Sequence, residues 1–339
     1  MRLLKLLFIL AIIILNIYAF THKRYENLSE GGSPNFFNIL KWKLTRHKAK
    51  WPDLPAAPSS TINGGIAEQV SGEDIVATYI NHSSFLIQAG STNIITDPIW
   101  SEYAGPYGKY GVKRSIYPGL STNQLPEIDF ILISHAHYDH LDIATIEELV
   151  RINKEVKIIT GLGVTKYIDH CKNNKNSCYE LNWWDNIRIG NSDTIIHFVP
   201  AHHWASRYFF DKDTSLWGGF VIQHGVENIY FSGDTGFGDG RIFQALKEEY
   251  GSFRLALLPI GAYKPNWLFT QMHLSPEQAV QIFTMLNSKN AIPLHFDTFQ
   301  LSDETYQDPI NDLNLALTKF NVDQSKFHIM KAGESWSIP

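Results

Sequence analysis

Three histidines and two aspartates fall within ten residues, ISHAHYDHLD (133–142), directly after an apolar run. His135 and His137 would point the same way if the preceding strand continued, whereas Asp139 and His140 fall in the turn beyond it. Imidazole nitrogen and carboxylate oxygen bind zinc readily, and a catalytic ion needs about three protein ligands and an open position for water. The motif therefore predicts a catalytic metal site, although one loop supplies too few ligands for two ions.

Three other apolar runs stop at residues that could complete a two-ion centre. FVPAHHWAS presents His202 and His203, NIYFSGDTG leads to Asp234, and AIPLHFDTF leads to His295. A single histidine after a strand is more often a capped or surface residue, but the combination with the H-x-H-x-D-H motif favours a shared centre. We therefore predict a binuclear metal site built at several strand ends.

Short runs with a period of two, rich in β-branched residues, predict the strands that position these residues. The expected strands cover residues 75–80, 84–90, 93–97, 130–134, 193–199, 218–224, 228–232, 255–259 and 291–294. Helical patterns cover residues 142–152, 164–172, 240–250, 275–287 and 309–320. This interleaving indicates an α/β fold.

One helix start can be predicted closely from the stretch SPEQAVQIFTML. Ser275 is a suitable N-cap, Pro276 suits the first helical position, and Gln278 completes a capping box. His273 is thereby placed on the loop that leads into the helix, where functional side chains often gather.

The first 70 residues differ from the rest of the 339-residue chain. Residues 1–20 are almost entirely apolar after Arg2 and Lys5, which is typical of a signal peptide or an N-terminal membrane anchor. Residues 1–50 carry nine Lys or Arg against two Glu, a balance of +7, so the remainder of the chain (total −5) carries −12. We expect residues 21–70 to form a basic linker or extension near a membrane surface. An acidic body argues against nucleic-acid binding.

The chain has two cysteines, Cys171 and Cys178, and no second cysteine pair with which they could form a zinc ribbon. They could form a disulfide if the protein is exported, and their expected role is structural or none.

The order H-x-H-x-D-H, His, Asp, His resembles that of the metallo-β-lactamase superfamily. Within it, the sequence is most similar to the family of phospholipases D that hydrolyse N-acylphosphatidylethanolamine and its bacterial relatives. The resemblance covers residues 71–339 and rests on NHSSFLI (81–87), TDPIW (96–100), LISHAHYDHLD (132–142), LNWWD (181–185), PAHHW (200–204), SGDTGF (232–237), PIGAY (259–263) and LHFDTF (294–299). It implies one catalytic domain with the αββα sandwich of the metallo-β-lactamase type.

The resemblance also implies which residues bind the metal ions. His135, His137 and His203 would hold one zinc ion, Asp139, His140 and His295 the other, and Asp234 would bridge them. Histidine and aspartate ligands of this kind also accept other divalent metals, such as manganese or iron. The family pattern P-x-Q-H-W makes His203, beside Trp204, the ligand, and His202 stands where that pattern has Gln.

The implied reaction is hydrolysis of N-acylphosphatidylethanolamine to N-acylethanolamine and phosphatidic acid, with a hydroxide between the two zinc ions as nucleophile. Asp139 would orient that hydroxide, and His273 would stabilise charge or protonate the leaving group. Tyr138, Trp204 and Tyr263 are the candidate substrate contacts, because aromatic side chains suit an apolar ligand.

The expected partners are a phospholipid substrate and a membrane surface, with a possible homodimer, in a bacterial cell envelope. A metal-dependent lactonase of the same fold is the main alternative. A non-catalytic lipid-binding protein has no use for seven convergent ligands. An aspartic protease is disfavoured because the DTG in FSGDTG lacks a convincing second copy.

Overall fold

The computed structural model describes residues 24–29, 31, 34, 36–54, 65–188, 193–208 and 210–339. The apolar segment expected at residues 1–20 lies outside the described residues. Within the described ranges, no helix is both long and apolar enough to cross a membrane.

The first of two large sheets contains the strand that leads into the H-x-H-x-D-H motif. In spatial order its strands are β15 (Ser335–Ser337), β1 (Ile75–Asn81), β2 (Ser84–Ala89), β3 (Thr92–Thr96), β6 (Phe130–Ile133), β7 (Lys157–Gly161) and β8 (Cys178–Leu181). The pairs from β15 to β3 are antiparallel, and those from β3 to β8 are parallel.

The second sheet contains the strands that lead to the other three predicted ligands. Its spatial order is β14 (Ser288–Leu294), β13 (Phe253–Pro259), β12 (Glu227–Phe231), β11 (Gly219–His224), β10 (Thr194–Val199) and β9 (Asn186–Ile187). Strands β12, β13 and β14 are parallel, so their carboxyl ends reach the same edge. A short ribbon of β4 (Tyr103–Ala104) and β5 (Val112–Lys113) lies outside both sheets.

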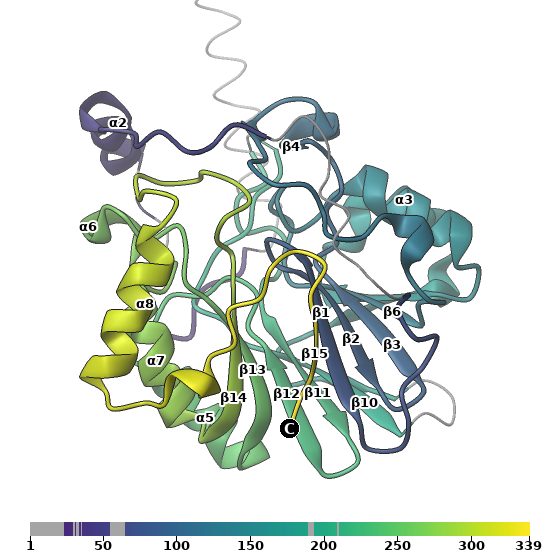
Figure 1. Ribbon diagram of the computed structural model, residues 1–339. Helices are drawn as coiled ribbons and strands as arrows, with labels where there is room; N and C mark the ends of the chain where they lie inside the picture. Colours follow the sequence, from purple (N-terminus) through teal and green to yellow (C-terminus); the bar gives the residue numbers. More distant parts are fainter. Residues whose placement is uncertain are drawn as a thin grey trace, which may run out of the picture.

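Helices cover the outer face of each sheet, as Figure 1 shows. The helices are α2 (Phe36–Thr45), α3 (Ile143–Ile152), α4 (Asp169–Asn173), α5 (Arg241–Tyr250), α6 (Asn266–Phe269), α7 (Pro276–Met285) and α8 (Asp308–Lys319), with 3₁₀ turns at Pro106–Gly108, Thr122–Gln124, Thr165–Tyr167, Lys175–Ser177 and Gln324–Lys326. Helices α5, α7 and α8 share a core with the second sheet, and α3 and α4 share one with the first. The order of layers is therefore αββα, which confirms the predicted fold class.

The alternation of side chains along each strand builds this layered core. In β6, Phe130 and Leu132 face the second sheet, whereas Ile131 and Ile133 face the helices. Because both faces are buried, the strand is apolar throughout, and its first polar side chains appear where it leaves the core. Each fully buried large apolar side chain contributes about 1.5–3 kcal/mol to the free energy of folding.

The helix start predicted at Ser275 is confirmed: its hydroxyl accepts from the Gln278 backbone N–H, and the Gln278 side chain accepts from the Ser275 N–H. The single helix predicted at 164–172 is wrong. The chain forms a 3₁₀ turn at Thr165–Tyr167 and then α4, because buried Ile168 adopts an extended conformation between them.

The described part of the basic extension packs against the domain, unlike a free linker. Asn27 accepts a hydrogen bond from the His203 backbone N–H at 3.0 Å and donates to the His203 carbonyl at 2.9 Å. Trp42 in α2 donates to Asp303 Oδ2 at 2.6 Å, and Arg46, which follows the helix, donates to Asp303 Oδ1 at 2.9 Å. The extension therefore contacts both the domain surface and a loop that carries a predicted metal ligand.

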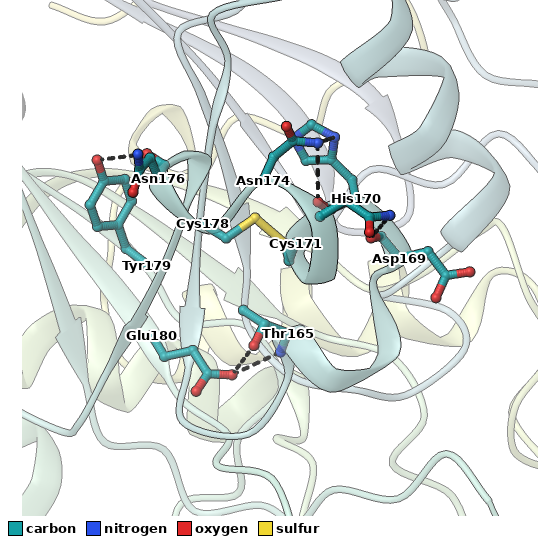
Figure 2. The surroundings of a disulfide bond; sticks show 10 residues. Thr165, Asp169, His170, Cys171, Asn174, Asn176, Cys178, Tyr179 and Glu180 are labelled. Carbon is teal, nitrogen blue, oxygen red and sulfur yellow. Dashed lines mark hydrogen bonds between the residues drawn. A yellow bond between two sulfur atoms is a disulfide. The ribbon is translucent and has the colours of Figure 1, made fainter.

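Cys171 in α4 and Cys178 at the start of β8 form a disulfide bond (Figure 2). Nearby, Glu180 of β8 accepts hydrogen bonds from the backbone N–H and the hydroxyl of Thr165, at 2.9 and 2.6 Å. These interactions attach the edge strand β8 to the preceding turn and helix. Of the two expectations for the cysteine pair, a structural role or none, the structure supports the structural role.

We predict that replacing the pair (Cys171→Ala with Cys178→Ser) lowers the free energy of unfolding by about 2.5 kcal/mol, the loop-closure value for so short a loop. Thermal unfolding of the oxidised parent and of the variant measures the difference. A reductant should lower the midpoint of the parent and leave that of the variant unchanged. Equal midpoints for the oxidised parent and the variant would contradict this role.

Candidate metal centre

The loop after β6 carries four predicted ligands within six consecutive residues, 135–140. The backbone N–H groups of His140 and Leu141 donate to the His137 carbonyl at 3.2 and 2.8 Å, which closes a tight turn. The side chains of His135 and His140 are buried, whereas those of His137 and Asp139 keep partial exposure. The spacing of the motif thus places two metal-ligand side chains, those of His135 and His140, on the enclosed side of the site and two, those of His137 and Asp139, on its open side.

The second sheet supplies the remaining ligands from the loops after three strands. His203 follows β10, Asp234 follows β12 and His295 follows β14, and all three residues are buried. As predicted from the apolar runs, they meet the H-x-H-x-D-H loop.

The first cluster contains His135, His137, His203 and Asp234, whose ligand atoms all lie within 4.8 Å of one another. His137 Nδ1 is 2.8 Å from His135 Nε2 and 3.3 Å from His203 Nε2. Asp234 Oδ2 lies 3.9 Å from His135 Nε2 and 3.7 Å from His203 Nε2. Three imidazoles and one carboxylate can together enclose a single divalent cation.

The second cluster contains His82, Asp139, His140 and His295, again within 4.8 Å. Asp139 Oδ2 lies 3.4 Å from Nε2 of both His140 and His295. Asp234 Oδ2 is 3.2 Å from the same two nitrogen atoms, so this carboxylate contacts both clusters. Its position is that of a bridging ligand.

Unsatisfied buried atoms provide a test of whether these residues suit metal ions. Among the described residues, Nε2 of His137, His140 and His295 and Oδ1 of Asp234 are buried and have no hydrogen-bond partner. Buried polar atoms are nearly always satisfied, so four unsatisfied ones at a single place require an explanation. Cations bound between the clusters would supply it, and the donor set fits them.

Outer hydrogen bonds fix the orientation of two of the rings. His140 Nδ1–H donates to Asp97 Oδ2 at 2.7 Å, and Ser134 donates to Asp97 through its backbone N–H and its hydroxyl. His203 Nδ1–H donates to the Met272 carbonyl at 2.8 Å. In both rings Nε2 keeps its lone pair directed into the cluster, as is usual for histidines that bind metals.

The electrostatics of the clusters also favour cations. Burial lowers the pKa of His137 and of His203 to about 3, so both rings are neutral, the form that binds metal. Burial also acts to lower the pKa of His295, but Asp234 and Asp139 outweigh it and raise this pKa to about 9. A divalent cation would displace that proton and neutralise the same carboxylates.

The structure separates the two adjacent histidines at the end of β10. His203 joins the first cluster, whereas His202 Nδ1 lies 3.0 Å from Ser29 Oγ and its ring packs near Gly238. This arrangement agrees with the assignment implied by the family pattern.

The other predicted site residues lie at different distances from the clusters. The ring of His273 is 5.1 Å from that of His203, and Trp204 packs at 4.4 Å against His137. Tyr138, on the motif loop itself, lies under the Arg207 guanidinium at 4.4 Å. Tyr263 donates its hydroxyl to Asp312 Oδ2 on α8 at 2.5 Å, and its contact with the substrate stays a prediction.

Two residues of the site were not predicted, His82 in the second cluster and Asp97 behind His140. Both belong to stretches that carried the family resemblance, NHSSFLI and TDPIW. Asp97 follows β3 directly, so the strand-end pattern that identified Asp234 could have found it. His82 lies in a hairpin turn, where no pattern of metal-ligand spacing points to it.

Buried His/Asp clusters at the strand ends of an αββα sandwich are typical of the binuclear metal site in a class of metal-dependent hydrolases. Residues 92–296 match the family model described as a beta-lactamase superfamily domain. The chain belongs to the metallo-β-lactamase superfamily and is a metal-dependent hydrolase of that fold.

Among its relatives is N-acyl-phosphatidylethanolamine-hydrolyzing phospholipase D 1 of Caenorhabditis elegans, 31% identical over 317 residues, which cover 90% of this chain and 89% of the relative. An uncharacterised protein of Mycobacterium tuberculosis is 31% identical over 81% of this chain and 72% of its own. Igni18, a metallo hydrolase of Ignicoccus hospitalis, aligns with a TM-score of 0.58 and 22% identity over 78% of this chain and 99% of its own, a likeness of fold.

We predict that His203→Ala removes one tightly bound ion per chain, whereas His202→Ala leaves the metal content unchanged. The two positions are adjacent, and only the first ring reaches the cluster. Metal analysis of the purified, folded variants provides the measurement. Loss of an ion in the His202 variant, or retention of both ions in the His203 variant, would contradict the assignment.

Proposed function

We propose that this protein is a zinc-dependent phosphodiesterase of the phospholipase D type, which hydrolyses N-acylphosphatidylethanolamine to N-acylethanolamine and phosphatidic acid. The observation that carries the proposal is a pair of clusters joined by Asp234 in a chain that aligns over nine-tenths of its length with such a phospholipase. The proposed ligands are His135, His137 and His203 for one ion, Asp139, His140 and His295 for the other, and Asp234 for both.

Zinc is the proposed metal because the donors are imidazole nitrogen and carboxylate oxygen, which zinc binds readily. When bound, two such ions supply a water of low pKa as nucleophile and stabilise charge on the phosphate oxygens. In the reaction the P–O bond to the ethanolamine oxygen breaks. The water oxygen remains on phosphorus, and a proton passes to the leaving alcohol.

The exposure of the side chains supports catalytic roles for Asp139 and His273. They keep 13% and 11% of their side-chain surface exposed, whereas the side chains of His140 and His295 are fully enclosed. Reacting groups must face the substrate, so the open side of the centre lies by these two residues. Asp139 would accept a hydrogen bond from the attacking water and orient it.

His273 would act through a hydrogen bond rather than as an acid. Burial lowers its pKa to about 3, so its ring is neutral, and bound cations would repel a further positive charge. A neutral N–H can still stabilise negative charge on a phosphate oxygen. Trp204 and Tyr138, beside the open side, would provide apolar contacts for the lipid.

Helix α2 supports the proposal that the protein works at a membrane surface. Trp42 packs inward at 5.1 Å from Phe269, while Leu40 and Leu44 on the opposite face are 41% and 77% exposed. Trp267 is 47% exposed, with Lys41 at 5.2 Å from its ring. Exposed apolar side chains and a basic one on α2 and the adjoining α6 suit a bilayer that contains anionic lipid.

We also propose that the protein is exported or anchored at the cell envelope. The disulfide bond supports this, because disulfides persist mainly in oxidising compartments. The homodimer remains a prediction.

We predict that the protein lacking residues 1–20 releases N-acylethanolamine from N-acylphosphatidylethanolamine vesicles. Asp139→Asn should lower this rate by about 10²-fold or more, since it removes a proposed ligand and the group that orients water. Chelation should abolish the activity, and added zinc should restore it. Product release is followed by mass spectrometry.

An acyl-homoserine lactone assayed in parallel tests the alternative function. Opening of the lactone without cleavage of the phospholipid would leave the metal centre intact and reject the phospholipase proposal.

We predict that Leu40→Ser with Leu44→Ser weakens sedimentation of the same shortened protein with phosphatidylglycerol-containing vesicles by about tenfold or more, because two exposed apolar side chains are lost. Leu315→Ser is the matched control, since this leucine on α8 is 68% exposed and should not contribute. Equal loss of sedimentation in both proteins would contradict a specific role for α2.

A further inference from the structure

His82 occupies an unusual position in the turn between β1 and β2. Its side chain is polar, yet the residue is only 1% exposed. Its φ angle of 49° lies in the left-handed region, which is uncommon for residues other than glycine. A buried polar side chain on a strained backbone is unfavourable unless its surroundings enforce it.

The segment that follows β14 holds His82 in this conformation. The His82 backbone N–H donates to Thr298 Oγ1 at 2.9 Å, and the His295 N–H donates to the His82 carbonyl at 3.0 Å. Thr298 Oγ1 in turn donates to Asp297 Oδ1 at 2.9 Å. His295 and Asp297 also have left-handed φ values, 60° and 59°, so both segments that meet at this contact have a strained backbone.

The ring of His82 is fixed as firmly as its backbone. It packs at 4.2 Å against the ring of His295 and meets the edge of Phe299 at 5.2 Å, with an interplanar angle of 81°. In this orientation His82 Nε2 lies 3.2 Å from Asp139 Oδ2, within hydrogen-bond geometry. Asp139 Oδ2 is the same atom that lies 3.4 Å from His140 Nε2 and from His295 Nε2.

We infer that His82 is a positioning residue, whose Nε2–H donates to Asp139 and holds that carboxylate toward the second metal ion. The inference rests on the proposed binuclear centre. Asp139 is the only ligand-type side chain of the second cluster with appreciable exposure among the described residues, and free carboxylates rotate easily. A donor fixed to a rigid turn removes that freedom, as outer hydrogen bonds do for metal ligands in general.

His82 belongs to the second cluster, so its ring must also be considered as a metal ligand. The hydrogen-bond geometry to Asp139 favours the donor role, because a nitrogen that donates its proton to a carboxylate has no lone pair there for a cation. The donor role and the ligand role can be distinguished by replacing His82 with a side chain that can donate a hydrogen bond but binds zinc poorly. Such a side chain should preserve metal binding only if His82 acts as a donor.

The experiment compares His82→Gln with His82→Asn in the full chain. The Gln amide reaches the place of Nε2 and can donate to Asp139, whereas the Asn amide is one methylene too short, and Asn tolerates the left-handed backbone. Metal-free protein is titrated with zinc against a competing chelator, and with cobalt(II) while its absorption spectrum is recorded. Thermal unfolding shows whether each variant is folded.

We expect His82→Asn to weaken binding of the second ion by about 10–100-fold, the usual effect of losing an outer hydrogen bond to a ligand. His82→Gln should bind both ions like the parent and give the parent cobalt(II) spectrum. His82→Phe, which keeps the ring packing but has no donor, should behave like the Asn variant and replaces it if that variant does not fold.

Parent-like affinity in both the Asn and Phe variants would overturn the proposal. So would equal loss in the Gln variant with a changed cobalt(II) spectrum, which would make His82 a ligand. A parent protein that binds fewer than two ions would reject the binuclear centre itself. Two ions bound without phospholipid cleavage would reject only the proposed substrate.

Discussion

The burial of the Asp234 carboxylate is the constraint on which the rest of the structure depends. Its side chain is only 2% exposed, and it lies within 4 Å of ring nitrogens of His135, His140, His203 and His295. A buried carboxylate is strongly unfavourable unless positive charge or hydrogen bonds compensate for its lost hydration. The fold must therefore bring histidine side chains from both sheets to the Asp234 carboxylate.

The two sheets meet this requirement through the way their strands end. Strands β12 and β14 flank β13 in parallel and deliver Asp234 and His295 to the same edge, opposite the loop that follows β6. A second buried carboxylate, Asp97, then holds His140 from behind. The same strands therefore stabilise the sandwich through their apolar side chains and position the charged and histidine side chains of the site at their carboxyl ends.

The basic extension connects the proposed membrane surface to the centre. Asn27 bonds to the backbone of His203, and α2 is attached through Asp303, eight residues after His295. Both contacts are made by polar groups that would be solvated by water if this segment were a free linker. Composition predicted the basic character of this segment, but not that it would pack beside a metal ligand, because such contacts depend on residues more than 170 positions away.

The sequence by itself determined the α/β class, the capped start of α7 and a shared site for the H-x-H-x-D-H loop and residues at three other strand ends, because strand periodicity and helix caps are local and each of these segments follows an apolar run. The family resemblance implied the αββα order of layers and the choice of His203 over His202, and both agree with the structure. Tertiary structure alone decided that Tyr263 bonds to α8 and that His82 meets Asp139. These outcomes depend on the direction of a side chain after a turn and on contacts between residues 49 and 57 positions apart in the sequence. No local pattern encodes them, since the partners are neighbours only after the two sheets have packed.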